Sequence, residues 1–470
     1  MSAMPRRAKQ IVLMVAVAFF MENLDGVVIV TALPQMARSL GVNAVDLNIG
    51  VTAYMLAAAV FIPLSGWMVD RFGARGVFAG AIALFTAASA LCGLSTGLWS
   101  FTASRVLQGI GGAMMMPVGR LVTLRTVDKR DMIRAVAYIV WPGLVAPVVG
   151  PPLGGFIATY LDWRWIFFLN LPVGLIGIGF ALALIGRERA AAPQRFDLVG
   201  FVLCGGACIA LTYGLELIGR APTPWLPMTV FVGAGLALGA LAIRHLRCAN
   251  APLIDLRALG IRSFAVTLGG GSLFRMSVTA VPFLLPLMFQ LGFGLDAFVS
   301  GLLVLAIFGG SLGMKVVSTR ALRRFGFRQV LLVNGALTTL TILGCAALTP
   351  ATPYAAMGVV LFAAGLARSL QFSAFNSLGF ADVPEAQMNA ANGVASVAQQ
   401  LSLGGGITIG VIALRLAGVL HHDIAIGPTT ADFHVAFVLV ALLTAISTLD
   451  ALTLPQDAGA VVSGRGVTTG

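Results

Sequence analysis

Residues 66–75 read Gly-Trp-Met-Val-Asp-Arg-Phe-Gly-Ala-Arg, a charged turn between two apolar stretches at 47–69 and 76–96. A related turn, Arg-Arg-Phe-Gly-Phe-Arg, occupies residues 323–328 and also separates two apolar stretches. About 20 apolar residues are enough for a helix to cross the hydrocarbon core of a bilayer. The pattern therefore predicts membrane-spanning helices that are joined by short charged turns.

The composition of the 470-residue chain agrees with a membrane location. Apolar residues make up 58% of the chain and charged residues only 10%, whereas about 25% of a soluble domain is charged. The net charge of +12 is distributed among many loops, while nucleic-acid binding needs basic side chains clustered on one face. These values exclude a nucleic-acid-binding protein and an ordinary soluble enzyme. The five cysteines are scattered, so no disulfide framework is indicated.

Fourteen apolar stretches are long enough to cross a bilayer as helices. They lie at 11–33, 47–69, 76–96, 98–123, 135–160, 165–186, 198–218, 226–246, 263–290, 297–317, 329–349, 353–375, 388–418 and 432–453. The first follows a basic start, as in a signal peptide. However, it contains Glu22 and Asp25 and lacks a small-residue cleavage site, so we expect it to be retained. The sequence thus predicts an all-α integral membrane protein.

Lysine and arginine are concentrated in alternate loops of this arrangement. Of the 30 basic residues, 21 lie in one set of loops and the two chain ends, and only Arg38, Arg164 and Arg220 lie in the other set. Loops rich in lysine and arginine face the cytoplasm. We therefore predict that both termini are cytoplasmic.

Two short strings recur in the same order, which indicates an internal repeat. The turn at 66–75 corresponds to the turn at 323–328, and Arg105-x-x-Gln108 corresponds to Arg368-x-x-Gln371. A six-helix unit used twice around a site at the bilayer midplane is a transporter architecture. The predicted parts are a first half at 1–190, two inserted helices with linkers at 191–255, a second half at 256–455 and a cytoplasmic tail at 456–470.

The turn at 66–75 resembles the Gly-x-x-x-Asp-Arg-x-Gly-[Arg/Lys] loop of the major facilitator superfamily. Glycines permit a tight turn and a close approach of helices, and an acid at the helix end can pair with a base on a neighbouring helix. The resemblance implies a conformational latch, and a generic charged cytoplasmic turn is the alternative. The latch candidates are Gly66, Asp70, Arg71, Gly73 and Arg75.

A glycine- and proline-rich string in the stretch at 135–160 resembles the Gly-Pro-x-x-Gly-Gly motif of the antiporter branch of this superfamily. Such residues kink a helix and let a neighbour pack against its backbone, which would seal the protein against proton leak. The residues of this antiporter motif are Gly143, Gly150, Pro151, Gly154 and Gly155.

Further strings resemble the fourteen-span drug:proton antiporters of the superfamily, at residues 24–34 and 163–174. Val27 and Val30 stand where that family usually has threonine and asparagine. Residues 111–120 resemble one branch of bacterial inner-membrane exporters. The resemblance covers essentially the whole chain, and it implies a major facilitator fold with two six-helix halves plus two inserted helices.

Charged side chains inside the apolar stretches are the candidates for proton coupling. Glu22 and Asp25 are three residues apart and share one helix face. An arginine at the bilayer centre costs roughly 2.5–3.5 kcal/mol, so Arg105 is expected to face a partner, and in the resembled family this arginine is tied to proton coupling. Burial favours the uncharged form of a carboxyl group, and a nearby guanidinium favours its charged form. We predict that Asp25, Glu22 and Arg105 couple transport to protons; a purely structural ion pair is the alternative.

A second group of embedded polar residues is predicted to line the substrate cavity. Arg275 lies at about the depth of the two acids in the repeat, and would balance those acids or bind an anionic group. A buried arginine among amides suits anionic or chelate substrates better than lipophilic cations. The cavity candidates are Arg275, Gln108, Gln371, Asn376 and Arg368.

These features together predict a proton-coupled antiporter that exports small molecules or drugs across the bacterial inner membrane by alternating access. No nucleotide-phosphate loop occurs in the sequence, so the expected energy source is the proton gradient. We expect no enzymatic activity, no cofactor, no metal site and no nucleic-acid partner. The expected partners are a small-molecule substrate, protons and membrane lipid, with the chain acting as a monomer. The alternatives are an exporter of a specific metabolite, organic anion or metal chelate, and a non-transporting membrane sensor with the same fold.

Overall fold

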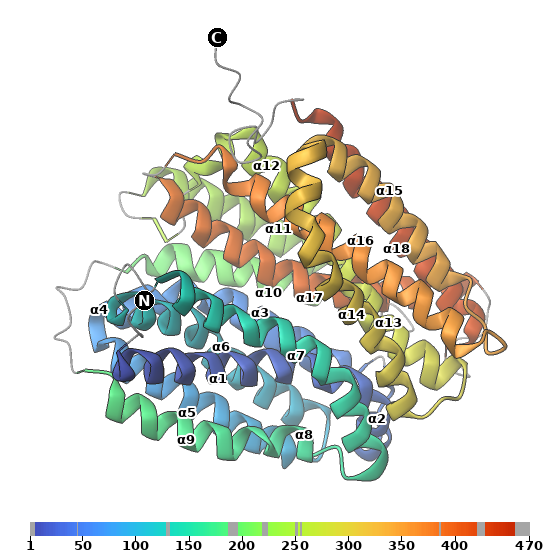
Figure 1. The fold of residues 1–470 in the computed structure, drawn as a ribbon, viewed down its shortest axis with the longest axis horizontal. Helices are drawn as coiled ribbons and strands as arrows, with labels where there is room; N and C mark the ends of the chain where they lie inside the picture. Colours follow the sequence, from blue (N-terminus) through green and yellow to red (C-terminus); the bar gives the residue numbers. More distant parts are fainter. Residues whose placement is uncertain are drawn as a thin grey trace. The chain divides into compact units, whose positions relative to one another are not determined.

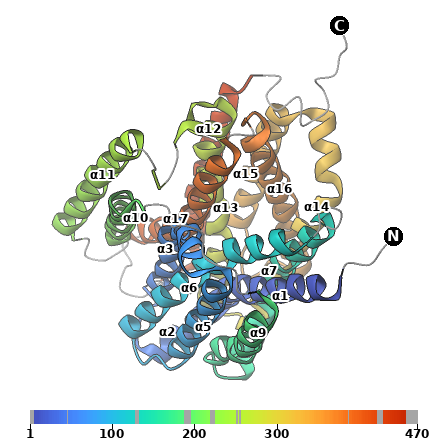
Figure 2. The same cartoon turned by 90° about the vertical axis from the view of Figure 1, so that its left-hand side faces the viewer.

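The computed structural model describes residues 5–44, 46–127, 132–186, 196–218, 224–249, 252–253, 256–384, 387–420 and 428–455. Within these ranges the regular structure is helical throughout, and the chain forms two compact units, Met1–Leu198 and Val199–Gly470. Figures 1 and 2 show the helices of each unit. The predicted boundaries of the inserted helix pair, residues 191 and 255, lie outside the described residues.

The first unit is built around α1, which packs against α6, α7 and α9, while α5 lies beside α6 and α9 (Figure 1). Large apolar side chains such as Phe19, Phe78 and Phe85 fill the core between these helices. Its helices are α1 (Arg6–Val28), η1 (Ile29–Ala32), α2 (Leu33–Leu40), α3 (Asn48–Phe61), α4 (Leu64–Phe72), α5 (Ala74–Gly93), α6 (Leu98–Thr126), α7 (Met132–Tyr160), α8 (Trp165–Phe168) and α9 (Asn170–Leu184).

In the second unit α13 packs against α17 and α18, and α14 packs along α16. Within this unit α10 and α11 form a pair, in which Gly214 and Gly235 bring the two backbones together. Its helices are α10 (Leu198–Ile218), α11 (Trp225–Cys248), η2 (Arg257–Gly260), α12 (Arg262–Leu268), α13 (Gly270–Leu287), η3 (Met288–Gly292), α14 (Ala297–Phe325), α15 (Phe327–Ala346), α16 (Tyr354–Ala381), α17 (Met388–Leu420), α18 (Thr430–Leu449) and η5 (Asp450–Thr453).

Several predicted spans are interrupted in the structure, at positions set by proline or glycine. The span predicted at 47–69 is bent by 59° between α3 and α4, where Pro63 lacks the N–H that would continue the helix. The span predicted at 263–290 is divided at Gly269 and ends in a π-helical turn, η3. Residues 262–292 still form one candidate crossing, whereas α3 and α4 form a bent pair.

Eleven helices of the described residues are long and apolar enough to cross a membrane, or twelve when the bent pair α3–α4 is one span. The chain is therefore a multi-pass membrane protein, but the predicted number of fourteen spans is not confirmed. The predicted spans 98–123 and 135–160 are helical as α6 and α7 but are not among these crossings. Helix α6 carries Arg105 and Arg120, and in α7 the apolar stretch Val145–Tyr160 is preceded by residues most of whose side chains lie outside the described set.

The two charged turns adopt the same backbone conformation in both units. Gly73 has a φ of 77° and Gly326 a φ of 78°, a region that side chains with a Cβ rarely enter. Each glycine ends one helix and begins the next, between α4 and α5 and between α14 and α15. This agreement supports the internal repeat inferred from the turns.

Glycine contacts fix the register of the repeat along α6 and α16. Gly109 on α6 lies against the carbonyl oxygen of Tyr54, and Gly365 on α16 lies in the same way against the carbonyl oxygen of Ile307. Arg105 lies four residues before Gly109, and Leu361 lies four residues before Gly365. Leu361 is therefore the repeat equivalent of Arg105. Arg368 lies seven residues further along, which is two helical turns. The sequence-based pairing of Arg105-x-x-Gln108 with Arg368-x-x-Gln371 was therefore wrong, because a four-residue string recurs easily in so apolar a composition.

A second pair of contacts fixes the register along α1 and α13. Gly154 on α7 lies against Val28 and Thr31, and Gly406 on α17 lies against Met276 and Thr279. In this register the position of Asp25 is occupied in the second unit by a leucine, Leu273. The acid–arginine pair of the first unit thus has two leucines as its repeat equivalents.

Candidate functional site

Asp25 and Arg105 form a fully buried ion pair in the first unit. Arg105 Nη1 donates to Asp25 Oδ2 at 2.5 Å, and neither side chain is exposed. The two residues come from α1 and α6, so the pair links two helices through the apolar core. A charge pair without solvent needs further hydrogen bonds to offset its desolvation.

Those hydrogen bonds come from side chains around the carboxylate. Asp25 Oδ1 accepts from Gln108 Nε2 at 2.9 Å and from Asn170 Nδ2 at 3.0 Å. Ser89 Oγ accepts from the same two amides at 2.8 and 3.2 Å and donates to the Phe85 carbonyl. The Asp25 side chain therefore accepts hydrogen bonds from three donors on α6 and α9.

Arg105 is held more loosely than Asp25. Its Nη1 atom also donates to Gln108 Oε1 at 2.5 Å, and its guanidinium lies 4.3 Å from the centre of the Tyr54 ring, a cation–π contact. Its Nε and Nη2 atoms have no acceptor among the described residues. All of its hydrogen bonds therefore run through one nitrogen.

Glu22 lies one turn before Asp25 on α1, but outside this network. Its Oε2 atom is buried and has no hydrogen-bond partner among the described residues. Arg120 on α6 interacts electrostatically with it. The predicted common face of Glu22 and Asp25 is present, and Arg120 is a neighbour that the sequence did not assign to Glu22.

Asn170 and Ser89 are network residues that the sequence analysis did not identify. Asn170 begins α9, and at that position its amide reaches both Asp25 and Ser89. A buried amide in an apolar helix needs partners. An asparagine soon after Trp163 and Trp165, at the start of an apolar stretch, was therefore a signal that a buried polar partner is present. Ser89 gave no such signal, because serine is common in apolar helices and bonds to the preceding turn.

Replacing Asn170 by leucine is expected to destabilise the protein by about 1.5–3 kcal/mol, the range for a hydrogen bond to a charged group. Thermal unfolding of the purified protein in detergent measures this loss. Asn23→Leu is the matched control, because the Asn23 amide donates only within its own helix, to the Phe19 carbonyl at 2.8 Å. Equal unfolding temperatures of the two variants would contradict the assignment of Asn170 to the Asp25 network.

The antiporter motif packs α7 directly against α1. Gly154 lies against the Val28 carbonyl, and Gly150 lies against Val27, whose Cβ is 3.2 Å from where a Cβ would stand on the glycine. Thr31 Oγ1 donates to the Pro151 carbonyl at 3.4 Å. Gly155 is buried in the same helix, whereas Gly143 faces open space. The packing surface is thus formed by residues 150–155.

The latch candidates lie at the turn between α4 and α5. Gly73 has the positive φ that the turn requires, whereas a side chain at Gly66 would meet no atom within 4 Å. Arg71 is exposed, and Asp70 and Arg75 are half-buried. Among the described side chains none forms an ion pair with Asp70. The side chains of Arg125, Lys129, Arg130 and Arg134 lie outside the described set.

In the second unit the structure brings Arg275 and Asn376 together. Arg275 Nη2 donates to Asn376 Oδ1 at 2.8 Å, and its Nη1 donates to the Thr267 carbonyl at 3.4 Å. The guanidinium also lies 5.5 Å from the Phe372 ring centre. Arg275 therefore links α12, α13 and α16, and its predicted role toward substrate stays a prediction.

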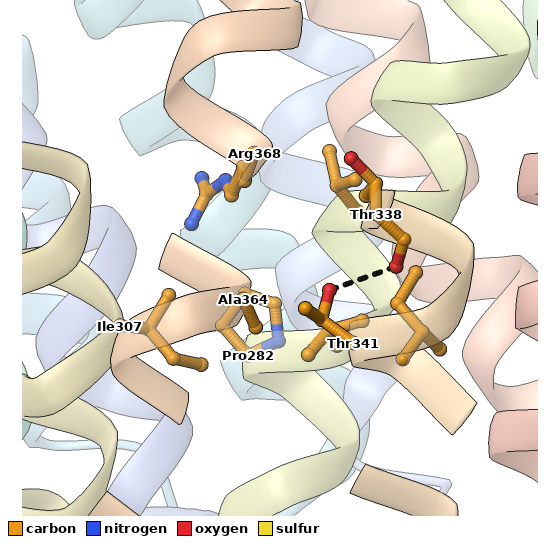
Figure 3. A pocket seen from close by; sticks show the side chains of 9 residues that line it. Pro282, Ile307, Thr338, Thr341, Ala364 and Arg368 are labelled. Atoms are coloured by element: carbon orange, nitrogen blue, oxygen red, sulfur yellow. Dashed lines mark hydrogen bonds between the residues drawn. The ribbon is translucent and has the colours of Figure 1, made fainter. Parts of the chain in front are cut away.

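The other predicted cavity residues of this unit differ in their surroundings. Gln371 is fully buried, donates to the Leu331 carbonyl at 2.9 Å and accepts from Asn334 Nδ2 at 2.9 Å. Arg368 lines a pocket between α13, α14, α15 and α16 (Figure 3). In the first unit Gln108 lies in the Asp25 network and is fully buried.

No cluster of three or more histidine, cysteine or acidic side chains that could hold a metal ion occurs in the part of the chain that the structure describes. In the first unit, the buried groups Glu22, Tyr54 and Cys92 instead interact electrostatically with the pair of Asp25 and Arg105. Apolar helices with a charge network in their core define the class of multi-pass membrane transporters.

The chain belongs to the major facilitator superfamily, whose family model, described as Major Facilitator Superfamily, matches residues 13–409. The "Putative multidrug resistance protein MdtD" of Escherichia coli (strain K12) is 35% identical over 462 residues, which cover 97% of both chains. The protein of the same name in Shigella boydii serotype 18 matches to the same extent. The resemblance to this branch, inferred from residues 111–120, is confirmed.

Solved structures show the same fold at low sequence identity. A D-xylose-proton symporter has a TM-score of 0.67 and 15% identity, with 96% of this chain and 99% of that chain covered. An auto-inhibited POT family peptide transporter has a TM-score of 0.66 and 17% identity, with 99% and 98% covered. The human organic anion transporter MFSD10 (TETRAN) has a TM-score of 0.60 and 14% identity, with 95% and 100% covered. The predicted major facilitator fold is confirmed by these similarities.

Proposed function

We propose that this protein exports small molecules, drugs among them, across the bacterial inner membrane in exchange for protons. The relatives described as multidrug resistance proteins support export of drugs, and the family supports transport by alternating access. The observation that carries the proton coupling is the buried pair of Asp25 and Arg105, since an intramembrane acid at a helix interface is the usual place for a proton relay.

The coupling step follows from the unequal anchoring of the two partners. When Asp25 takes up a proton, it loses its Coulomb attraction to Arg105, while Gln108 and Asn170 still hold its oxygens. Arg105 keeps its contacts with Gln108 and with the Tyr54 ring. Protonation thus removes the ionic link between α1 and α6 and leaves the weaker hydrogen bond from Gln108, so the two helices can shift more easily relative to each other.

The energy for export comes from the proton gradient in this proposal, with no cofactor. One proton that enters down about 150 mV provides roughly 3.5 kcal/mol. This is enough for a substrate gradient of a few hundredfold, because each 1.4 kcal/mol corresponds to about a factor of ten. One proton per cycle therefore supplies enough energy for a gradient of this size when the exported substrate is neutral.

The topology that we propose has fourteen spans and both termini in the cytoplasm, with the chain acting as a monomer. The strong excess of lysine and arginine in alternate loops supports it. The turn of Asp70, Arg71 and Gly73 acts as the cytoplasmic latch, and the contact of α7 with α1 seals the first unit against proton leak.

Reconstituted protein with a pH-sensitive dye inside the vesicles tests the function. Addition of ethidium or fluorescein is expected to release protons from vesicles that carry an imposed pH gradient, at a rate at least severalfold above empty vesicles. If protons leave vesicles with and without the protein at the same rate, for both compounds, the antiporter proposal is contradicted. A non-transporting sensor would then be favoured.

A second candidate within transport is the export of an organic anion. The observation that favours it is the presence of Arg275 and Arg368 inside the second unit, whose helices α13, α14, α15 and α16 contain no aspartate or glutamate. A preference for fluorescein over ethidium in the same vesicles would support this candidate, and the reverse preference would contradict it.

A further inference from the structure

A small cavity of about 10 Å³ lies between α13, α14, α15 and α16 of the second unit, which is space for roughly one water molecule. Its wall is mostly apolar, and Figure 3 shows the guanidinium of Arg368 at one side with the hydroxyls of Thr338 and Thr341 opposite. The residues that line it are Val278, Val281, Pro282, Ile307, Thr338, Thr341, Ile342, Ala364 and Arg368.

Arg368 is the one charged group of this wall, and its charge lacks compensation. Its Nη1 atom is buried and has no acceptor among the described residues, and its guanidinium lies 5.6 Å from the Phe308 ring centre. Buried charges in proteins are normally paired or hydrogen-bonded, since desolvating an unpaired ion is costly. A buried, unpaired guanidinium such as that of Arg368 is therefore expected to bind an anionic partner.

The helices around the cavity do not supply that partner. Helices α13, α14, α15 and α16 contain no aspartate or glutamate in their sequences. The two threonine hydroxyls donate to the carbonyls of Asn334 and Thr338, both at 2.8 Å. Arg368 is thus the only charged donor that the wall offers.

Comparison of the two units shows that this arrangement is specific to the second unit. In the repeat register, Arg368 stands at the position of Gly112, and a side chain at Gly112 would come within 3.6 Å of Glu22 Oε1. The equivalent of Glu22 in the second unit is a glycine, Gly270. The second unit therefore has the guanidinium of Arg368 at a position where the first unit has a glycine.

The size of the cavity limits what can bind there. Pockets for drug-sized ligands usually measure roughly 300–1,000 Å³, so this cavity of about 10 Å³ fits no more than a small ion or the charged end of a larger molecule. One guanidinium neutralises one negative charge, and the apolar wall disfavours a second charge.

We propose that this cavity binds one monovalent anionic group at Arg368, either a halide ion or the carboxylate of an amphipathic molecule. The carboxylate source deepens the proposed function, on which it rests, because it makes small organic monocarboxylates a substrate class. The binding itself does not depend on transport.

Equilibrium binding to the full-length protein in detergent tests the proposal without any proton gradient. The probes are radiolabelled chloride and radiolabelled benzoate, in a sulfate buffer, because the wall disfavours a doubly charged anion. Arg368→Gln is expected to weaken binding of the bound probe about tenfold or more, the loss typical of a hydrogen bond to a charged group. Arg368→Lys, which keeps the charge, is expected to retain part of the binding.

The control is Arg262→Gln, which removes the same charge at the exposed start of α12 and is expected to bind as the unsubstituted protein does. Binding of chloride alone assigns the site to an inorganic anion, and benzoate binding that chloride displaces assigns it to a carboxylate. The proposal is overturned if neither probe binds the unsubstituted protein, or if a monodisperse Arg368→Gln protein binds as tightly. Neither result bears on proton exchange at Asp25.

Discussion

Replacing Asp25 by asparagine is expected to reduce the rate of proton-driven export about a hundredfold or more. A reduction of this size is typical when a positioned proton-transfer group is removed. Asparagine has the same shape as aspartate and can still accept hydrogen bonds from Gln108 and Asn170. It cannot alternate between charged and neutral forms. The variant therefore removes the titration of residue 25 with little change in packing.

Two transport modes in reconstituted vesicles separate this loss from a loss of folding. Export driven by an imposed pH gradient is expected to fail, whereas exchange of labelled for unlabelled ethidium without a gradient is expected to continue. Asp162→Asn serves as the control, because Asp162 is an exposed acid of the same unit, 3.5 Å from Arg164. Unimpaired gradient-driven export by Asp25→Asn would show that another group carries the proton.

A double substitution distinguishes coupling from a purely structural ion pair. Removing one partner of a buried pair leaves an unpaired charge, which costs about 3–5 kcal/mol. Asp25→Asn with Arg105→Gln removes both charges, so its unfolding temperature is expected to exceed that of Asp25→Asn alone. If the pair serves only stability, this double variant regains gradient-driven export as well; if it couples protons, export stays lost.

The sequence was sufficient to predict the major facilitator fold and the central ion pair, while the predicted number of fourteen spans stays unconfirmed. Charged residues are so rare in the apolar stretches that Asp25 and Arg105 had few possible partners, and the cost of burying each one favours their pairing. The turn glycines were also predictable, because Gly73 and Gly326 occupy a backbone region that other residues avoid.

Other features depend on helix rotation and depth, which a short motif does not encode. The match of Arg105 with Arg368 was out of register by two turns, and only the contacts of Gly109 and Gly365 with neighbouring backbones revealed it. In the same way, nothing in the string around Asn170 shows which buried acid its amide contacts, namely Asp25 on the adjacent helix α1. Arg120 beside Glu22 is a third such case.

Replacing Gly154 by alanine is expected to have the other large effect, on stability and on proton leak. A Cβ at this position would overlap the carbonyl oxygen of Val28 on α1, and Thr31 Oγ1 also lies against it. A backbone atom cannot swing aside as a side chain can, so α7 must move away from α1. Overpacking of this kind costs about 1–3 kcal/mol, sometimes more.

Gly143→Ala on the same helix is the matched control, because a Cβ there meets no atom within 4 Å. Alanine in a helix is favoured over glycine by up to about 1 kcal/mol, so this variant is expected to unfold at the same or a slightly higher temperature. Passive collapse of a pH gradient across vesicles measures the seal between α7 and α1. We expect Gly154→Ala to leak protons faster than Gly143→Ala, because separating the helices opens a path beside Asp25. If Gly154→Ala unfolds at a lower temperature but both variants leak protons at the same rate, the motif contributes to packing and does not seal the protein against protons.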